Sequence, residues 1–215
     1  PFRKAIAEAG ALGVMSSYND YNGEPITGSR RFLTDILRHE WGFKGYVVSD
    51  SEALEFLYTK HHVAASYEDA CALAVNAGLN VRTQFTQPSE FITPLRQAVA
   101  SGKISRETLD ERVGEVLRVK FWLGLFDQPY RGDAARVDRI VHSEPHRQLA
   151  LDAARQSMVL LKNDSATLPL SAQMKRVAVI GPNADARPIS RYGPAGADVV
   201  SVVDGVRQLL PQAEV

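Results

Sequence analysis

Cysteine is almost absent from this sequence. Cys71 is the only one among 215 residues, so the chain cannot close an internal disulfide, and we interpret it as a small core residue. Neither sign of charge is in excess, because 25 Lys and Arg balance 25 Asp and Glu. This balance gives no long-range attraction for nucleic acid or an anionic membrane. Long apolar runs are also missing, and a membrane-spanning helix needs about 20 such residues. We therefore expect no nucleic-acid partner and no membrane insertion.

The composition that remains is typical of a globular protein, with 45% hydrophobic and 23% charged residues. The sequence starts at Pro1 with neither Met nor a signal peptide, and it ends just after a predicted helix. We therefore expect an internal piece of a longer protein, whose N-terminus does not identify a compartment.

The first half alternates short apolar strands with amphipathic helices. Strands are predicted over residues 12–17, 45–49 and 79–82. Helices are predicted to follow Ser29, Ser66 and Ser105 as N-caps, with Asp69 completing a capping box after Ser66. A further helix covers residues 89–100, in which we expect Pro94 to lie in the first turn.

This order predicts parallel strands joined by crossover helices. Three strands are too few for a covered sheet, and a complete barrel needs about 250 residues. The predicted fold class is therefore α/β: residues 1–127 form the C-terminal part of a (β/α)₈ TIM-like barrel, residues 128–173 a linker, and residues 174–215 the start of an α/β sandwich domain.

The second half has weaker patterns. Proline and glycine between residues 128 and 145 predict an irregular connector, followed by a short helix near Leu149. We expect strands over residues 157–161 and 176–180, and the next α/β unit over residues 199–210.

Candidate reactive groups lie where parallel strands end. Tyr18, Asn19 and Asp20 follow the first predicted strand, and Asp50, Ser51 and Glu52 follow the second. By position alone, a helix cap or a surface loop carboxylate explains Asp50 as well as a reactive role does.

Other chemistry has little support in the sequence. His61 and His62 are adjacent, and Pro145 separates His142 from His146, so neither pair matches a metal-binding spacing. Pro182 follows the single Gly181, where a nucleotide-binding loop needs further glycines and their amides. We expect no metal and no cofactor.

Five segments in order resemble glycoside hydrolase family 3. They are Val14-Met-Ser-Ser-Tyr-Asn19 with Asn22, Gly23 and Pro25; Leu33-Thr-Asp-Ile-Leu-Arg-His-Glu-Trp-Gly-Phe-Lys-Gly-Tyr-Val-Val-Ser-Asp50; Arg112-Val to Phe126-Asp127; Ala154 to Asn163 with Leu168-Pro-Leu170; and Val177-Ala-Val-Ile-Gly-Pro182. The resemblance covers nearly the whole chain and implies the barrel and second domain described above.

The resemblance implies that Asp50 is a catalytic nucleophile. It also implies that Tyr18 contacts the sugar near that nucleophile and that Met15 lines the same subsite, although Met15 as a core residue fits equally well. The family's acid/base Glu is expected outside this chain. Since that group and most of the barrel are missing, we expect the 215-residue chain alone to be inactive.

Two positions, Ser51 and Asn80, depart from the family pattern, and Arg82 lies close to the second in the sequence. Ser51 stands where many glucosidases have Trp, and we include it as a candidate substrate contact that leaves room for a pentose. Asn80 stands where the third strand often carries Asp. Arg82 is expected to form an internal ion pair rather than to contact substrate.

The resemblance implies a retaining β-glycosidase of carbohydrate metabolism and polysaccharide catabolism, cleaving terminal β-D-glucosyl residues from small oligosaccharides or glycosides through a covalent intermediate. A β-xylosidase or α-L-arabinofuranosidase is the alternative within the family, ahead of a β-N-acetylhexosaminidase. A non-catalytic carbohydrate-binding relative is the alternative from another class. The family favours a periplasmic or secreted bacterial protein.

Overall fold

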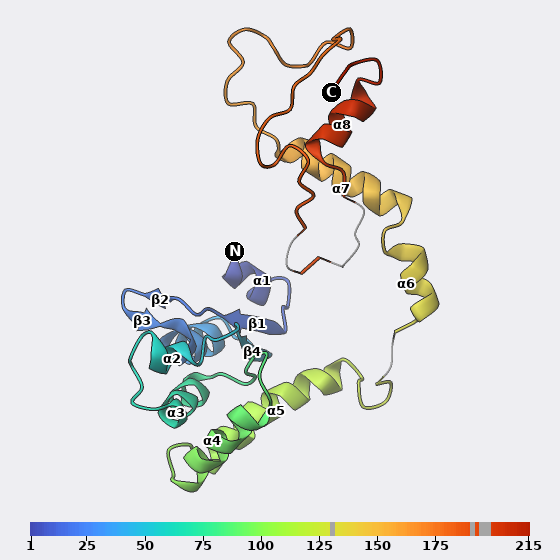
Figure 1. Cartoon of the computed structure of the whole chain (residues 1–215). Helices are drawn as coiled ribbons and strands as arrows, with labels where there is room; N and C mark the ends of the chain where they lie inside the picture. The colour runs from blue at the N-terminus through green and yellow to red at the C-terminus, as the bar shows by residue number, and fades with distance from the viewer. Residues whose placement is uncertain (130–131, 190–191, 194–198) are drawn as a thin grey trace. The chain divides into compact units, whose positions relative to one another are not determined.

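A computed structural model describes residues 1–129, 132–189, 192–193 and 199–215 (Figure 1). The chain divides into two compact units, Pro1–Gly132 and Asp133–Val215. Residues 130–131, 190–191 and 194–198 of the expected linker and second domain lie outside the described residues. Each unit is described by itself below.

The first unit mixes short strands with helices. In chain order these are α1 (Phe2–Ala7), β1 (Gly13–Ser16), β2 (Asp20–Tyr21), β3 (Glu24–Pro25), the 3₁₀-helix η1 (Ile26–Gly28), the π-helix η2 (Arg31–Glu40), β4 (Tyr46–Ser49), α2 (Phe56–Thr59), α3 (Tyr67–Ala77), α4 (Ser89–Ala100) and α5 (Arg106–Trp122).

The predicted parallel pairing is confirmed for the first two strands. β1 and β4 pair in parallel, from Gly13 opposite Tyr46 to Ser16 opposite Ser49. The third predicted strand is reduced to one parallel bridge between Val48 and Val81.

The side chain of Asn80 explains why that third strand is so short. The Val47 N–H donates to Asn80 Oδ1 at 2.7 Å, in place of the backbone carbonyl that would extend the ladder. On the other side of the bridge, Ser49 N–H still donates to Val81 O at 2.8 Å.

The predicted helix starts are confirmed at three serines. Ser66 Oγ accepts from Asp69 N–H, Ser105 Oγ from Thr108 N–H, and Ser29 Oγ from Phe32 N–H, each at 3.1 Å. These bonds satisfy amides that a helix leaves without internal partners.

The expectation for Pro94 is wrong, because α4 starts at Ser89 and places Pro94 in its interior. Such a proline removes one helical hydrogen bond. Ala98 is the only residue of α4 that is buried, so the carbonyl left without its donor lies on a helix that water can reach.

A hydrophobic core joins η2, β4, α2 and α3. Its buried members are Ile6, Leu33, Leu37, Phe43, Val47, Leu54, Leu57, Ala70, Cys71, Ala74, Ala77 and Leu79. A smaller cluster of Ala72, Val75, Ala98 and Ile104 holds α3 against α4. Cys71 is fully buried, as expected of a core residue.

The second unit contains α6 (Ala134–Ile140), α7 (Glu144–Ser157) and α8 (Val202–Leu209). The expectation of an irregular connector was wrong where α6 forms: Asp133 Oδ1 accepts from Ala135 N–H at 3.0 Å and caps it. α7 is longer than the short helix predicted near Leu149. α8 lies in the predicted α/β unit and begins with a capping box between Ser201 and Asp204.

The strands predicted for the second unit are not observed within the described residues. α7 runs to Ser157, and residues 158–161 belong to neither a helix nor a strand. Residues 176–180 form one parallel bridge, between Arg176 and Glu214. A strand requires a neighbour for its backbone groups, and only that short segment provides one here.

Candidate active site

The loops that follow β1 and β4 emerge at the same edge of the parallel pair. Asp50 is the first residue after β4, and its N–H donates to Ser16 O, at the end of β1, at 2.9 Å. Tyr18 follows β1 by two residues. The parallel register therefore brings these two side chains to one region.

A pocket of about 370 Å³ lies at this edge. It is lined by Phe2, Ala5, Ile6, Ala11, Gly13, Val14, Met15, Ser17, Tyr18, Asn19 and Asp50. Three of the four predicted site residues, Met15, Tyr18 and Asp50, are among them. Ser51 is the fourth and is absent from this lining.

Met15 and Tyr18 present large surfaces to the pocket. Met15 is 61% exposed and Tyr18 is 42% exposed, so Met15 is not a core residue in the described structure. Asp50 is half-buried. An apolar and aromatic wall beside a carboxylate is the usual composition of a small-molecule site.

Local hydrogen bonds fix the Asp50 loop. Ser51 N–H donates to Asp50 Oδ1 at 2.7 Å, and Ala53 N–H donates to Asp50 O at 3.2 Å. Ala53 and Leu54 are buried and tie the loop to the core. The bond from Ser51 is typical of a loop aspartate. This bond holds one carboxylate oxygen of Asp50 in place. Asp50 differs from an ordinary turn residue because it also lines the pocket.

The internal ion pair predicted for Arg82 is confirmed. Its guanidinium lies 2.5 Å from Glu55 Oε1, and Arg82 also donates to Thr86 Oγ1 at 3.0 Å. The Tyr67 hydroxyl donates to the same Glu55 oxygen at 3.1 Å. Burial, and then the Glu55 charge, raises the pKa of Tyr67 well above its usual range. Through Glu55, this cluster connects the loop after β4 to Arg82, which follows the Val81 bridge, and to Tyr67 of α3.

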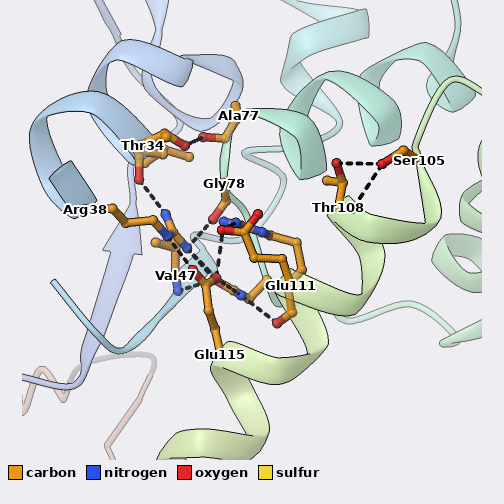
Figure 2. Close-up of polar contacts among 12 residues, drawn as sticks. Thr34, Arg38, Val47, Ala77, Gly78, Ser105, Thr108, Glu111 and Glu115 are labelled. Atoms are coloured by element: carbon orange, nitrogen blue, oxygen red, sulfur yellow. Dashed lines mark hydrogen bonds and ion pairs between the residues drawn. The ribbon is translucent and has the colours of Figure 1, made fainter.

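Asn80 belongs to a polar network that it forms with Arg38 of η2 and with residues of α5. Its amide donates to Arg112 O at 2.8 Å and to Glu115 Oε2 at 2.6 Å, and its oxygen accepts from Arg38 at 3.0 Å. Figure 2 shows Arg38 reaching Gly78 and Glu115. The departure from the family's Asp is thus accommodated by a structural role for Asn80.

Electrostatics in this network favour an ionised Glu115. Burial alone raises the pKa of the Glu115 carboxyl, but hydrogen bonds from Arg38 and Asn80 and the charges of Arg38 and Arg112 outweigh burial and hold that pKa below its ordinary value.

Sequence reasoning missed two features of the site. Helix α1 supplies Phe2, Ala5 and Ile6 to the pocket wall. His61 Nε2 lies 2.9 Å from Tyr18 O, although 43 positions separate the two residues. Neither contact follows from hydrophobic periodicity or from a local motif, so no signal in the sequence pointed to either.

Metal ligands are not clustered in the part of the chain that the structure describes: no three His, Cys, Asp or Glu side chains there could hold one ion. Among the same residues we find no helix with the length and apolar character needed to cross a membrane.

Comparison with known families follows the same division of the chain. A model described as the glycosyl hydrolase family 3 N terminal domain matches residues 1–119, and one described as the C-terminal domain of that family matches residues 158–214. The chain belongs to glycosyl hydrolase family 3. The resemblance inferred from five ordered segments is therefore confirmed.

The names of individual family 3 relatives refer to different sugars, glucose in some and xylose in others. A periplasmic beta-glucosidase of Salmonella typhimurium is 40% identical over 87% of this chain, and a putative beta-xylosidase of Formosa agariphila is 38% identical over 85%. The chain covers 24% of each, so it spans about a quarter of the length of these curated relatives. The structure of a beta-glucosidase from Listeria innocua in complex with gluconolactone superposes with a TM-score of 0.83 at 33% identity, over 99% of this chain and 29% of that one.

Proposed function

We propose that the protein containing this chain is a retaining β-glycosidase that removes terminal β-D-glucosyl residues from small oligosaccharides or glycosides. The observation that carries this proposal is the shared pocket of Asp50, Tyr18 and Met15 at the carboxyl ends of β1 and β4. Membership of family 3, and the gluconolactone complex of the Listeria innocua protein, support a carbohydrate as the ligand.

In this mechanism the ionised Asp50 attacks the anomeric carbon and forms a covalent glycosyl-enzyme, while a second carboxylic acid protonates the departing oxygen. Water then hydrolyses the intermediate, with the second group acting as base. We place that acid/base group outside this chain. The phenol of Tyr18 would donate a hydrogen bond that stabilises the ionised carboxylate of Asp50.

Trapping of the covalent intermediate tests the proposal. Incubation of the full-length protein with a 2-deoxy-2-fluoro-β-glucosyl fluoride should leave one sugar on the peptide that contains Asp50, detected by mass spectrometry. Intact peptide with no label at any carboxylate would favour a non-catalytic carbohydrate-binding relative. A label elsewhere would overturn the assignment of Asp50.

A β-xylosidase or α-L-arabinofuranosidase is the second candidate. Ser51 replaces the bulky Trp of many glucosidases, and the Formosa agariphila relative is named for xylosidase activity. The ratio of kcat/KM for aryl β-glucoside, β-xyloside and α-L-arabinofuranoside decides between these sugars.

The domain organisation follows from the same assignment. We propose that residues 1–127 are the C-terminal part of a (β/α)₈ barrel, residues 128–173 a linker, and residues 174–215 the start of an α/β sandwich. A periplasmic or secreted location is proposed because the Salmonella typhimurium relative is named periplasmic. Cell fractionation with a cytoplasmic marker enzyme tests that location.

A further inference from the structure

One short segment of the Asp50 loop contacts Tyr18 at two different points. The rings of Tyr18 and Phe56 lie with centroids 6.2 Å apart and planes at 70°, in an edge-to-face contact. His61 Nε2 lies 2.9 Å from Tyr18 O. The segment from Phe56 to His61 therefore holds both the ring and the backbone of Tyr18.

The direction of the His61 bond is fixed by its partner. A carbonyl oxygen only accepts, so His61 Nε2 must carry the proton. The neutral ring with a proton on Nε2 and the doubly protonated ring can both donate from that atom. The contact therefore acts as a brace, a hydrogen bond that holds the Tyr18 backbone.

The bracing segment is itself rigidly connected. Leu57 is fully buried in the core, and its carbonyl accepts from Val63 N–H at 2.9 Å. Lys60 Nζ lies 5.1 Å from the centre of the Phe56 ring, on the side chain that meets Tyr18. Phe56 N–H donates to Glu52 O at 2.9 Å, which links α2 to the turn that starts at Asp50.

We propose that Phe56 and His61 are positioning residues that hold the Tyr18 phenol in register with Asp50. This inference rests on the proposed function, in which Asp50 is the nucleophile. The chain runs from Asp50 through α2 to His61, and Phe56 and His61 on this segment contact Tyr18. The same segment therefore connects the two pocket residues, Asp50 after β4 and Tyr18 after β1. Small displacements of such groups reduce rates strongly.

A double-mutant cycle in the full-length protein tests the brace. His61→Ala should lower kcat for an aryl β-glucoside by about tenfold, with a smaller change in KM. His61→Gln should restore most of the rate, because its side-chain amide also donates a hydrogen bond. In a Tyr18→Phe background His61→Ala should cost little more, since the hydroxyl it positions is gone. An equal loss of rate in both backgrounds would overturn the proposal.

A measurement without catalysis separates this proposal from the assignment of the activity. With 3-fluorotyrosine incorporated, the ¹⁹F resonance of Tyr18 is identified by its absence in Tyr18→Phe. His61→Ala and Phe56→Ala should each shift or broaden that resonance, and His61→Gln should leave it near its original position. An unchanged Tyr18 resonance in both alanine variants would contradict the proposal that Phe56 and His61 position Tyr18. If the wild-type protein had no glycosidase activity, the proposed function would be wrong. The ¹⁹F resonance would still show whether Phe56 and His61 position Tyr18.

Discussion

Arg38 and Glu115, 77 positions apart, form a buried two-pronged ion pair: Arg38 Nε donates to Glu115 Oε1 at 2.7 Å and Arg38 Nη2 donates to Glu115 Oε2 at 2.8 Å. Both side chains are less than a tenth exposed. The pair ties η2 to α5 beneath the strands that carry the candidate site, and Arg38 also donates to Gly78 O at 2.8 Å.

Removing one member of this pair should destabilise the first unit strongly. Arg38→Ala leaves the Glu115 carboxylate buried with fewer partners, which we expect to lower the free energy of unfolding by about 3 kcal/mol. The matched control is Arg106→Ala, whose exposed pair with Asp110 at 3.3 Å should contribute nothing measurable. Urea denaturation followed by circular dichroism makes the comparison. Equal midpoints for the two variants would show that the buried pair adds no stability.

Acid should weaken the first unit through Glu115. Its pKa lies below the ordinary value of 4.5 in the folded state, so the unfolded chain binds a proton more readily. The stabilisation is therefore complete above pH 4.5 and is lost as the pH falls through the folded pKa. Glu115→Gln should lower stability at neutral pH and flatten the fall below pH 4.5. An unfolding profile below pH 4.5 that is as steep in Glu115→Gln as in wild type would contradict this role.

The Asn80 position separates what sequence alone predicts from what it does not. Strand ends and serine caps are predicted correctly because they depend on local residue types, such as the run Tyr46–Ser49 and the Ser66 cap. The short third strand is missed because Asn80 replaces a backbone acceptor with its side chain, and its partners Arg38 and Glu115 are distant in sequence.

The same distinction explains the site and the second unit. The loops of Asp50 and Tyr18 are predicted to lie together because parallel strands place their carboxyl ends at one edge, whereas the roles of the two residues come from the family resemblance. The His61 contact to Tyr18 depends on the path of the loop after Asp50, which has no periodicity to read. The strands expected after Ser157 fail because apolar composition alone does not supply a neighbouring strand.

Restoring the family's Asp at the third strand should be harmful here. In Asn80→Asp a carboxylate replaces the amide that donates to Glu115 Oε2 at 2.6 Å, so two acceptors meet and Arg112 O loses its donor. We expect a loss of about 2 kcal/mol in unfolding free energy. Asn76→Asp is the control, because Asn76 makes a similar bond to Lys103 O at an exposed site. Equal melting temperatures for Asn80→Asp and Asn76→Asp would refute the account.

The Cys71 thiol should be inert in the folded protein. It is fully buried, and burial, followed by the nearby Glu55 charge, raises its pKa to about 12. Since the thiolate is the reactive form, iodoacetamide at pH 8 should leave Cys71 unmodified until denaturant is added. Peptide mass spectrometry with and without guanidinium chloride measures the modified fraction. Rapid alkylation under native conditions would show that α3 opens far more often than its packing implies.

Asp50→Ala provides the decisive chemical prediction. Loss of the nucleophile should reduce turnover of an aryl β-glucoside by the full protein at least about a thousandfold, the scale on which enzymes lose rate when a catalytic nucleophile is removed. Azide or formate can enter the space left by the carboxylate, attack the anomeric carbon from the same face, and restore part of the rate with an inverted product. Glu52→Ala is the control, since Glu52 is an exposed carboxylate of the same loop outside the pocket lining, and it should keep near wild-type activity. Retained activity in Asp50→Ala, or a rate that azide does not raise in a protein that still binds glucoside, would move the nucleophile to another residue.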